Sequence, residues 1–337
     1  MRSRTGKDLR REGMDLSLIT LIDLFAATKQ TEGRSSKIVS WYRGMLAPFV
    51  EYVSNDDPAK LSNINIDDAR DFIASLQNRT TRYENHPLTP TQQGGLSPHT
   101  IHGYVRALKA FSSWLADEGY SDEDIFARLK RPKLPRPTIN ILSDEEINRL
   151  ISAINPDCPL GARMYVIVLL LLDTGIRASE LCTLTLGNTF IDQDYVKVCG
   201  KGRKERMVPF GATTKKALIR YITTWRPEPA YDDSDKVALS VYGTPLTYDG
   251  LLQAVKRLGR RADVPRVHPH LLRHTFSVRD LMNGGDVMTL RLTLGHTTLD
   301  VTQMYMHLAE SHVKVQHHRF SPVDRLAIGR KRRRRRP

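Results

Sequence analysis

The sequence is poor in cysteine and has no long apolar run. Its three cysteines among 337 residues are Cys158, Cys182 and Cys199, which are widely spaced and form no CxxC pair. This pattern excludes a disulfide framework and a zinc knuckle. No apolar stretch approaches the roughly 20 residues that cross a bilayer, and the basic N-terminus lacks the apolar segment of a secretory signal. We therefore expect a cytoplasmic protein with reduced cysteines.

Two common signatures of nucleotide and metal chemistry are also missing. There is no GxxxxGK[ST] phosphate loop and no cluster of acidic residues suited to Mg²⁺. His270 and His274 have the i, i+4 spacing of a zinc pair. However, the residues between them lack the glutamate of HExxH, and the adjacent Arg273 would repel a cation. We expect neither a metal nor a cofactor.

What the sequence has is positive charge. The formal net charge is +14 and the isoelectric point is near 9.8. The run RKRRRRR at residues 330–336 supplies half of that charge, so the remainder of the chain is basic as well. Cationic side chains release counterions from phosphates, which favours a nucleic-acid partner. A merely basic surface is the alternative that charge alone leaves open.

Composition and periodicity divide the chain into five parts. We expect a basic extension at residues 1–15, a helical domain at 16–130 and a linker at 131–140. A second domain follows at 141–320, and a tail at 321–337 ends in the arginine run. In the first domain, Ser97 and Pro98 are typical of a helix start. Residues 78–95 are polar and rich in threonine, proline and glycine, so we expect a loop there.

The stretch around the linker, ARLKRPKLPRP, combines three prolines with five basic residues. Prolines favour an extended chain, which could lie along a DNA backbone or be a solvated connection. Two further basic residues lie in the second domain. The candidate DNA-binding residues are Arg128, Lys130, Arg131, Lys133, Arg136, Arg203 and Lys204.

The second domain begins with a capping box, Ser143 and Glu146, before an apolar-periodic helix. Further helices are expected up to residue 172 and again from Ala178. The period then changes in TFIDQDYVKVCGKGRKERMVPF, where the strand-like residues begin at Tyr195 and predict two strands joined by a Gly-Lys-Gly turn. Helices resume from Thr213 and from Thr247. The domain is therefore expected to be helical with a small hairpin.

Four polar segments stand out in this second domain. Arg177 follows an apolar stretch, where an unpaired charge is costly, and Glu180 lies one turn on to hold it. Lys201 in the turn could equally be a solvated lysine, and Tyr305 an ordinary packed aromatic. The segments are TGIRASEL, CGKGRKER, HPHLLRHTF and LGHTTLDVTQMYMH.

Taken together, these residue types suit the metal-free cleavage of a phosphodiester. Two guanidinium groups can hold the non-bridging oxygens and neutralise the charge that develops on them. A tyrosine hydroxyl can attack the phosphorus and form a covalent intermediate. A lysine can protonate the leaving 5′ oxygen. The bond energy is then kept, and religation is possible.

The four segments, in this order, resemble the tyrosine recombinase or phage integrase family, including its Xer-type members. The resemblance covers most of residues 143–308, and residues 16–140 resemble the family's core-binding part less specifically. It implies a mainly α-helical fold with a small sheet or hairpin. An N-terminal helical (SAM-like) core-binding domain would precede an α+β catalytic domain.

The same resemblance implies how the phosphate is bound. Arg177 and Arg273 would bind the scissile phosphate, and Lys201 would act as the general acid. Glu180 would hold the arginines in position without contacting the phosphate.

It also implies the residues around the nucleophile. Tyr305 would be the nucleophile, His270 would assist proton transfer there, and His296 would hydrogen-bond the phosphate or the tyrosine. His274 is expected to be structural.

We therefore predict a site-specific DNA recombinase that forms a 3′-phosphotyrosine and a Holliday junction. It would act as a homotetramer on paired double-stranded core sites, with or without a partner recombinase, and would not associate with membranes. The short stretch before the first helix favours a two-domain, Xer-like organisation. The alternatives are DNA relaxation of the type IB topoisomerase kind and a noncatalytic DNA-binding protein.

Overall fold

The computed structural model describes residues 16–54, 58–82, 90–134, 140–200, 204–231, 235–295 and 323. By its contacts the chain divides into two compact units, residues 1–137 and 138–337. That boundary falls within the stretch for which the sequence predicts a linker. None of the helices in the described ranges has the length and apolar character needed to cross a membrane.

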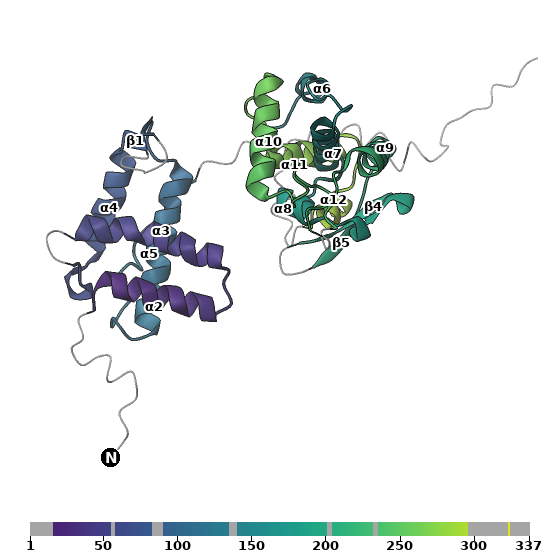
Figure 1. Ribbon diagram of the computed structural model, residues 1–337. Helices are drawn as coiled ribbons and strands as arrows, with labels where there is room; N and C mark the ends of the chain where they lie inside the picture. The colour runs from purple at the N-terminus through teal and green to yellow at the C-terminus, as the bar shows by residue number, and fades with distance from the viewer. Residues whose placement is uncertain are drawn as a thin grey trace, which may run out of the picture. The chain divides into compact units, whose positions relative to one another are not determined.

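The first unit is a small bundle of helices (Figure 1). The helices are α2 (Leu18–Thr31), α3 (Ser36–Val53), α4 (Ile66–Asn78) and α5 (Pro98–Asp117). The start of α5 follows from local sequence, because Ser97 Oγ accepts a hydrogen bond from the amide of Thr100 at 3.1 Å and Pro98 occupies the first helical position. Large aromatic side chains fill the core, where Phe25 contacts Phe111 with ring centroids 5.6 Å apart.

The polar stretch at residues 78–95 is more ordered than expected. Strands β1 (Thr81–Arg82) and β2 (Gln92–Gln93) pair antiparallel within it, with Thr81 opposite Gln93. The sequence predicted a loop over these residues and did not predict these two pairs. Their exposed and partly exposed polar residues give no alternating apolar pattern by which short strands are recognised.

The second unit is built around the helix α7 (Pro159–Thr174), which lies in the middle of the unit in Figure 1. It is buried along most of its length and packs against α9 (Ala212–Arg220) and α11 (Pro269–Met282). The remaining helices are α6 (Asp144–Ser152), α8 (Ala178–Thr183), α10 (Tyr248–Arg261) and α12 (Val287–Leu294). Because α7 is apolar on all sides, it serves as the central element of the core.

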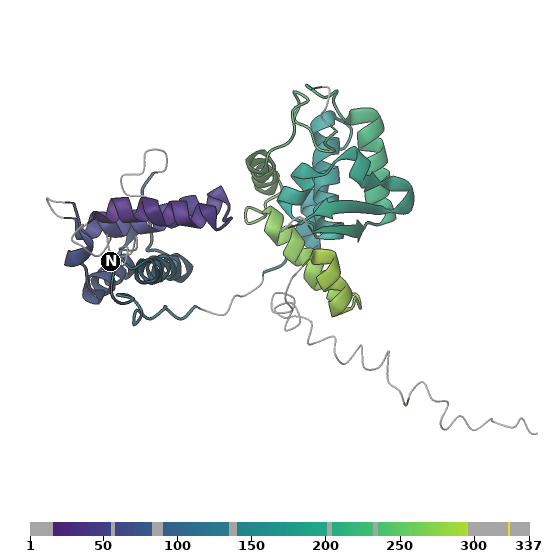
Figure 2. The same cartoon turned by 90° about the horizontal axis from the view of Figure 1, so that it is seen from below.

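A small antiparallel sheet lies beside these helices. Its order is β3 (Thr189–Phe190), β4 (Tyr195–Cys199) and β5 (Glu205–Pro209). The predicted strands are β4 and β5, whereas β3 was not predicted. Contacts join β5 to α12, which Figure 2 shows in yellow-green next to the sheet. The mainly helical fold with a small sheet is confirmed.

Candidate active site

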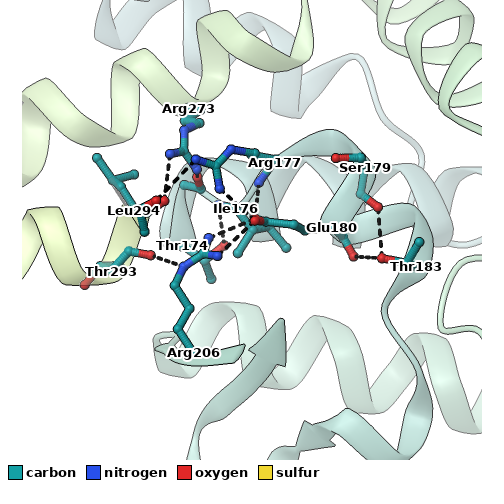
Figure 3. A network of polar contacts seen from close by, with 12 residues as sticks. Thr174, Ile176, Arg177, Ser179, Glu180, Thr183, Arg206, Arg273, Thr293 and Leu294 are labelled. Atoms are coloured by element: carbon teal, nitrogen blue, oxygen red, sulfur yellow. Dashed lines mark hydrogen bonds and ion pairs between the residues drawn. The ribbon is translucent and has the colours of Figure 1, made fainter. Parts of the chain in front are cut away.

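The first arginine of the candidate site lies at the junction between α7 and α8. Gly175 ends α7 in the left-handed conformation, with φ of 60°, and Arg177 immediately precedes α8. The ion pair expected from the i, i+3 spacing is present, because Arg177 Nη1 donates to Glu180 Oε1 at 2.8 Å. The Arg177 amide also donates to Glu180 Oε2 at 2.8 Å. Both the backbone and the side chain of Arg177 are therefore fixed by one carboxylate (Figure 3).

Glu180 binds a second arginine from the sheet. Arg206 on β5 donates from Nη1 to Oε1 at 2.9 Å and from Nη2 to Oε2 at 2.8 Å. Burial on its own would raise the pKa of Glu180, but the hydrogen bonds from Arg206 and Arg177 outweigh it and lower the pKa. The carboxylate is therefore ionised at neutral pH, although its side chain is only 3% exposed.

The third arginine, Arg273 on α11, is buried. Its Nη1 donates to the carbonyl of Gly175, and its Nη2 donates to the carbonyl of Leu294 at 2.9 Å. A buried charge is stable only when polar groups surround it. Here the carbonyls come from the end of α7 and the end of α12, so Arg273 joins those two ends.

Three consecutive carbonyls at the end of α12 accept hydrogen bonds from the three arginines. Thr293 accepts from Arg206 Nε at 2.7 Å, and Leu294 accepts from Arg273. Gly295 accepts from Arg177 Nη2 at 3.4 Å. The carboxyl end of a helix carries partial negative charge, which suits guanidinium groups. The three arginines therefore converge on the last residues of α12 and on Gly295, and Figure 3 shows the three arginines with Thr293 and Leu294.

The histidines of α11 lie next to this cationic group. Partial burial lowers the pKa of His270, and the charges of Arg273 and then Arg177 lower it further. The pKa of His274 is lowered by burial and then by His270 and His268. His268 has a lowered pKa for the same first reason, burial, and its Nδ1 accepts from the Leu271 amide at 3.2 Å. At neutral pH the His270 imidazole is therefore neutral and can accept a proton.

The guanidinium groups of Arg177, Arg206 and Arg273 and the carboxylate of Glu180 have a formal charge of +2 in total. A net positive charge of this kind favours an anion, and guanidinium groups suit one with two oxygens, such as a phosphodiester. Within the described ranges, no group of three His, Cys, Asp or Glu side chains could hold a metal ion.

Comparison with known proteins identifies the family. The model of the phage integrase family matches residues 140–312. A tyrosine recombinase XerC of Oceanobacillus iheyensis is 31% identical over 306 residues, which cover 89% of this chain and 95% of the relative. The chain belongs to the phage integrase family. The predictions of a tyrosine recombinase and of a site-specific DNA strand transferase are thereby confirmed.

Solved structures of other tyrosine recombinases share the fold. The XerH recombinase bound to its difH substrate in a pre-cleavage complex has a TM-score of 0.66 and 21% identity, with 86% of this chain and 80% of that chain covered. The Tn1549 transposon integrase in complex with transposon right-end DNA has a TM-score of 0.68 and 19% identity, with 91% and 100% covered.

Several candidate residues of this recombinase lie outside the described residues: Arg136, Lys201, Arg203, His296 and Tyr305. The described residues next to two of them lie at the arginine group. A Cβ atom built on Gly200 would be 3.6 Å from Glu180 Oε1, and the carbonyl of Gly295 binds Arg177. Lys201 and His296 therefore each follow directly on a residue that lies close to Arg177 or Glu180. The other candidate DNA-binding residues, Arg128, Lys130, Arg131, Lys133 and Lys204, are exposed.

Sequence reasoning missed Arg206. It lies opposite Val198 in the hairpin and on the same face as the buried Val208. A strand places residues i and i+2 on one face. A charged residue in phase with the buried valines was therefore the signal that this arginine points inward toward a partner.

Proposed function

We propose that this recombinase cuts and rejoins DNA at the arginine group through a 3′-phosphotyrosine intermediate. The observation that supports the proposal is the convergence of Arg177 and Arg273 on consecutive carbonyls at the end of α12. Two guanidinium groups side by side match the two non-bridging oxygens of a scissile phosphate. They also stabilise the additional negative charge of the pentacovalent transition state.

The reaction assigned to the site balances as a transesterification. The Tyr305 oxygen forms a bond to phosphorus while the bond from phosphorus to the 5′ oxygen breaks. His270, neutral at neutral pH, takes part in removing the phenol proton, and Lys201 gives a proton to the leaving 5′ oxygen. His296 hydrogen-bonds the phosphate or the tyrosine. Religation is the reverse step with the 5′ hydroxyl of a second strand.

The substrate is double-stranded DNA carrying paired core sites. Exposed basic residues before the domain boundary, Arg128, Lys130, Arg131 and Lys133, together with Arg136, are proposed to follow the phosphate backbone. Lys204 and Arg203 extend this contact from the hairpin. Residues 16–130 are proposed as the core-binding domain and 141–320 as the catalytic domain.

Strand exchange through a Holliday junction is proposed to require four protomers on two sites. The participation of a second recombinase is the alternative assembly. Cross-linking of the protein bound to labelled sites measures how many protomers assemble. Repeating it with an excess of a second recombinase measures whether that protein joins the assembly.

A nicked duplex tests the nucleophile. When the nick lies next to the scissile phosphate, the short leaving strand diffuses away and the covalent adduct accumulates. The wild-type protein should form an adduct that resists denaturation, and Tyr305→Phe should form none, because it lacks the attacking oxygen. An adduct in both proteins would show that another residue attacks.

The roles of the two phosphate-binding arginines are tested by truncation. Arg177→Ala and Arg273→Ala should reduce single-turnover cleavage by about 100-fold or more each. Affinity for the site should change little, because many other phosphate contacts remain. Band shifts at equilibrium and cleavage rates, measured on the same duplex, separate the two effects. A large loss of affinity with normal cleavage of bound DNA would contradict the assignment.

The general acid is tested with a modified substrate. Sulfur in place of the bridging 5′ oxygen leaves as a thiolate, which needs no proton because thiols have pKa values near 8.5. Lys201→Ala should cleave ordinary DNA slowly and the sulfur-containing DNA at close to the wild-type rate. Equal defects on both substrates would mean that Lys201 does not deliver the proton.

A further inference from the structure

Arg206 connects three separate segments of the second unit. From β5 its Nε donates to the carbonyl of Thr293 at the end of α12, 2.7 Å away. Its two terminal nitrogens donate to the two oxygens of Glu180 on α8. Each nitrogen of the guanidinium group thus has a protein partner, and the side chain is only 12% exposed. Figure 3 shows this side chain rising from the sheet toward Glu180. Such a side chain is suited to holding other groups in place.

The same side chain lies close to the positions where two glycines, Gly200 and Gly295, lack a side chain. A Cβ atom on Gly295 would lie 3.1 Å from Arg206 Nε and Nη1. A Cβ atom on Gly200 would lie 3.4 Å from Arg206 Nη1. Gly295 also has φ of 64°, which favours glycine. Arg206 therefore leaves little room for a side chain at either of the residues that precede Lys201 and His296.

The charge of Arg206 changes what Arg177 can do. Glu180 accepts hydrogen bonds from both arginines, so the three side chains together carry a formal charge of +1. Without Arg206, the carboxylate and Arg177 would neutralise each other. Charge pairs with little access to water interact strongly, and the side chain of Glu180 is almost fully buried.

We propose that Arg206 is a positioning residue that balances the charge of Glu180 and thereby leaves the positive charge of Arg177 available to the scissile phosphate. The inference rests on the proposed function, because it takes Arg177 to bind that phosphate. Arg206 itself touches no DNA in this scheme. It acts through Glu180 and through the Thr293 carbonyl.

Three variants of the full-length protein test the charge balance in single-turnover cleavage of the nicked duplex. Arg206→Met removes the charge and should slow cleavage by about 100-fold, as the loss of a transition-state contact does. Arg206→Lys keeps the charge but loses the planar set of N–H donors. Its cleavage rate should stay within about 10-fold of wild type. Adding Glu180→Gln to Arg206→Met removes both charges and should restore much of the lost rate. Affinity for the site should be similar in all three.

A matched control is Arg220→Met. Arg220 forms an exposed ion pair with Asp157 in the same unit, and such pairs contribute little. This variant should cleave at close to the wild-type rate. Thermal unfolding of every variant reports whether it folds. If Arg206→Met is unfolded, Arg206→Lys and the double variant carry the test, and both should cleave within about 10-fold of wild type.

Two results would overturn the inference. One is cleavage at the wild-type rate by folded Arg206→Met. The other is that the Arg206→Lys and double variants fold but cleave as slowly as Arg206→Met. That result would indicate a purely structural role, which depends on the shape of the side chain and not on its charge. Tyr305→Phe in parallel separates this inference from the proposed function. If the wild-type protein forms no adduct, the proposed function fails; if it does and only the Arg206 results disagree, the inference alone fails.

Discussion

Replacing Gly175 with alanine should destabilise the second unit and disturb the arginine group. Gly175 ends α7 with φ of 60°, and its carbonyl accepts a hydrogen bond from Arg273. A Cβ atom there would lie 2.2 Å from Cδ1 of Phe276 and 3.0 Å from Cδ2 of Leu294. Real Cβ atoms do not approach a ring carbon so closely, so Phe276 or the backbone must move.

Two effects of the substitution lower the free energy of unfolding. The left-handed conformation costs a residue with a Cβ about 1–2 kcal/mol. Overpacking against a partly buried ring costs about 1–3 kcal/mol. We therefore expect a loss of about 2–5 kcal/mol, which lowers the thermal midpoint of a domain of this size by about 4–20 °C.

Calorimetry of the full-length protein measures the midpoint, and hydrogen exchange assigns the destabilisation to residues 138–337. Two glycines serve as controls. Gly33 has φ of 77° with nothing within 4 Å, so Gly33→Ala should show only the conformational cost, in the first unit. Gly187 has open space and no positive φ, so Gly187→Ala should be close to neutral. A Gly175→Ala protein less than about 1 kcal/mol below wild type would refute the reasoning.

Three further predictions use other features of the chain. His268, His270 and His274 have lowered pKa values in the folded protein, so their contribution to stability is complete above the unfolded pKa near 6.5 and is lost as the pH falls below it; denaturation between pH 8 and 5 measures this, and His274→Gln should flatten the curve. Deleting residues 329–337 should reduce the slope of DNA affinity against salt concentration, because seven basic side chains are removed; an unchanged slope in filter binding would contradict this. Ser143→Ala should cost about 1 kcal/mol because it removes the cap of α6, whereas Ser143→Asp should cost little.

Much of the fold was predictable because its signals are local. The capping box of Ser143 and Glu146 forms as the spacing predicts, with hydrogen bonds of 2.9 and 3.2 Å. The start of α5 at Pro98 and the two hairpin strands also follow from residues close in sequence. Strand β3 and the β1–β2 pairing were missed, since strands of two residues are too short to show a period.

The candidate site likewise combines contacts that are local in sequence with contacts between distant residues. The family, the helical class and the ion pair between Arg177 and Glu180 could be predicted from the sequence, because residues three apart on one helical turn are neighbours. The contacts of Arg206 with Glu180, 26 residues away, and with Thr293, 87 residues away, became visible only in the folded chain. Such contacts depend on how the folded chain brings β5, α8 and the end of α12 together. No local pattern selects one acidic partner for Arg206 from the 37 in the chain.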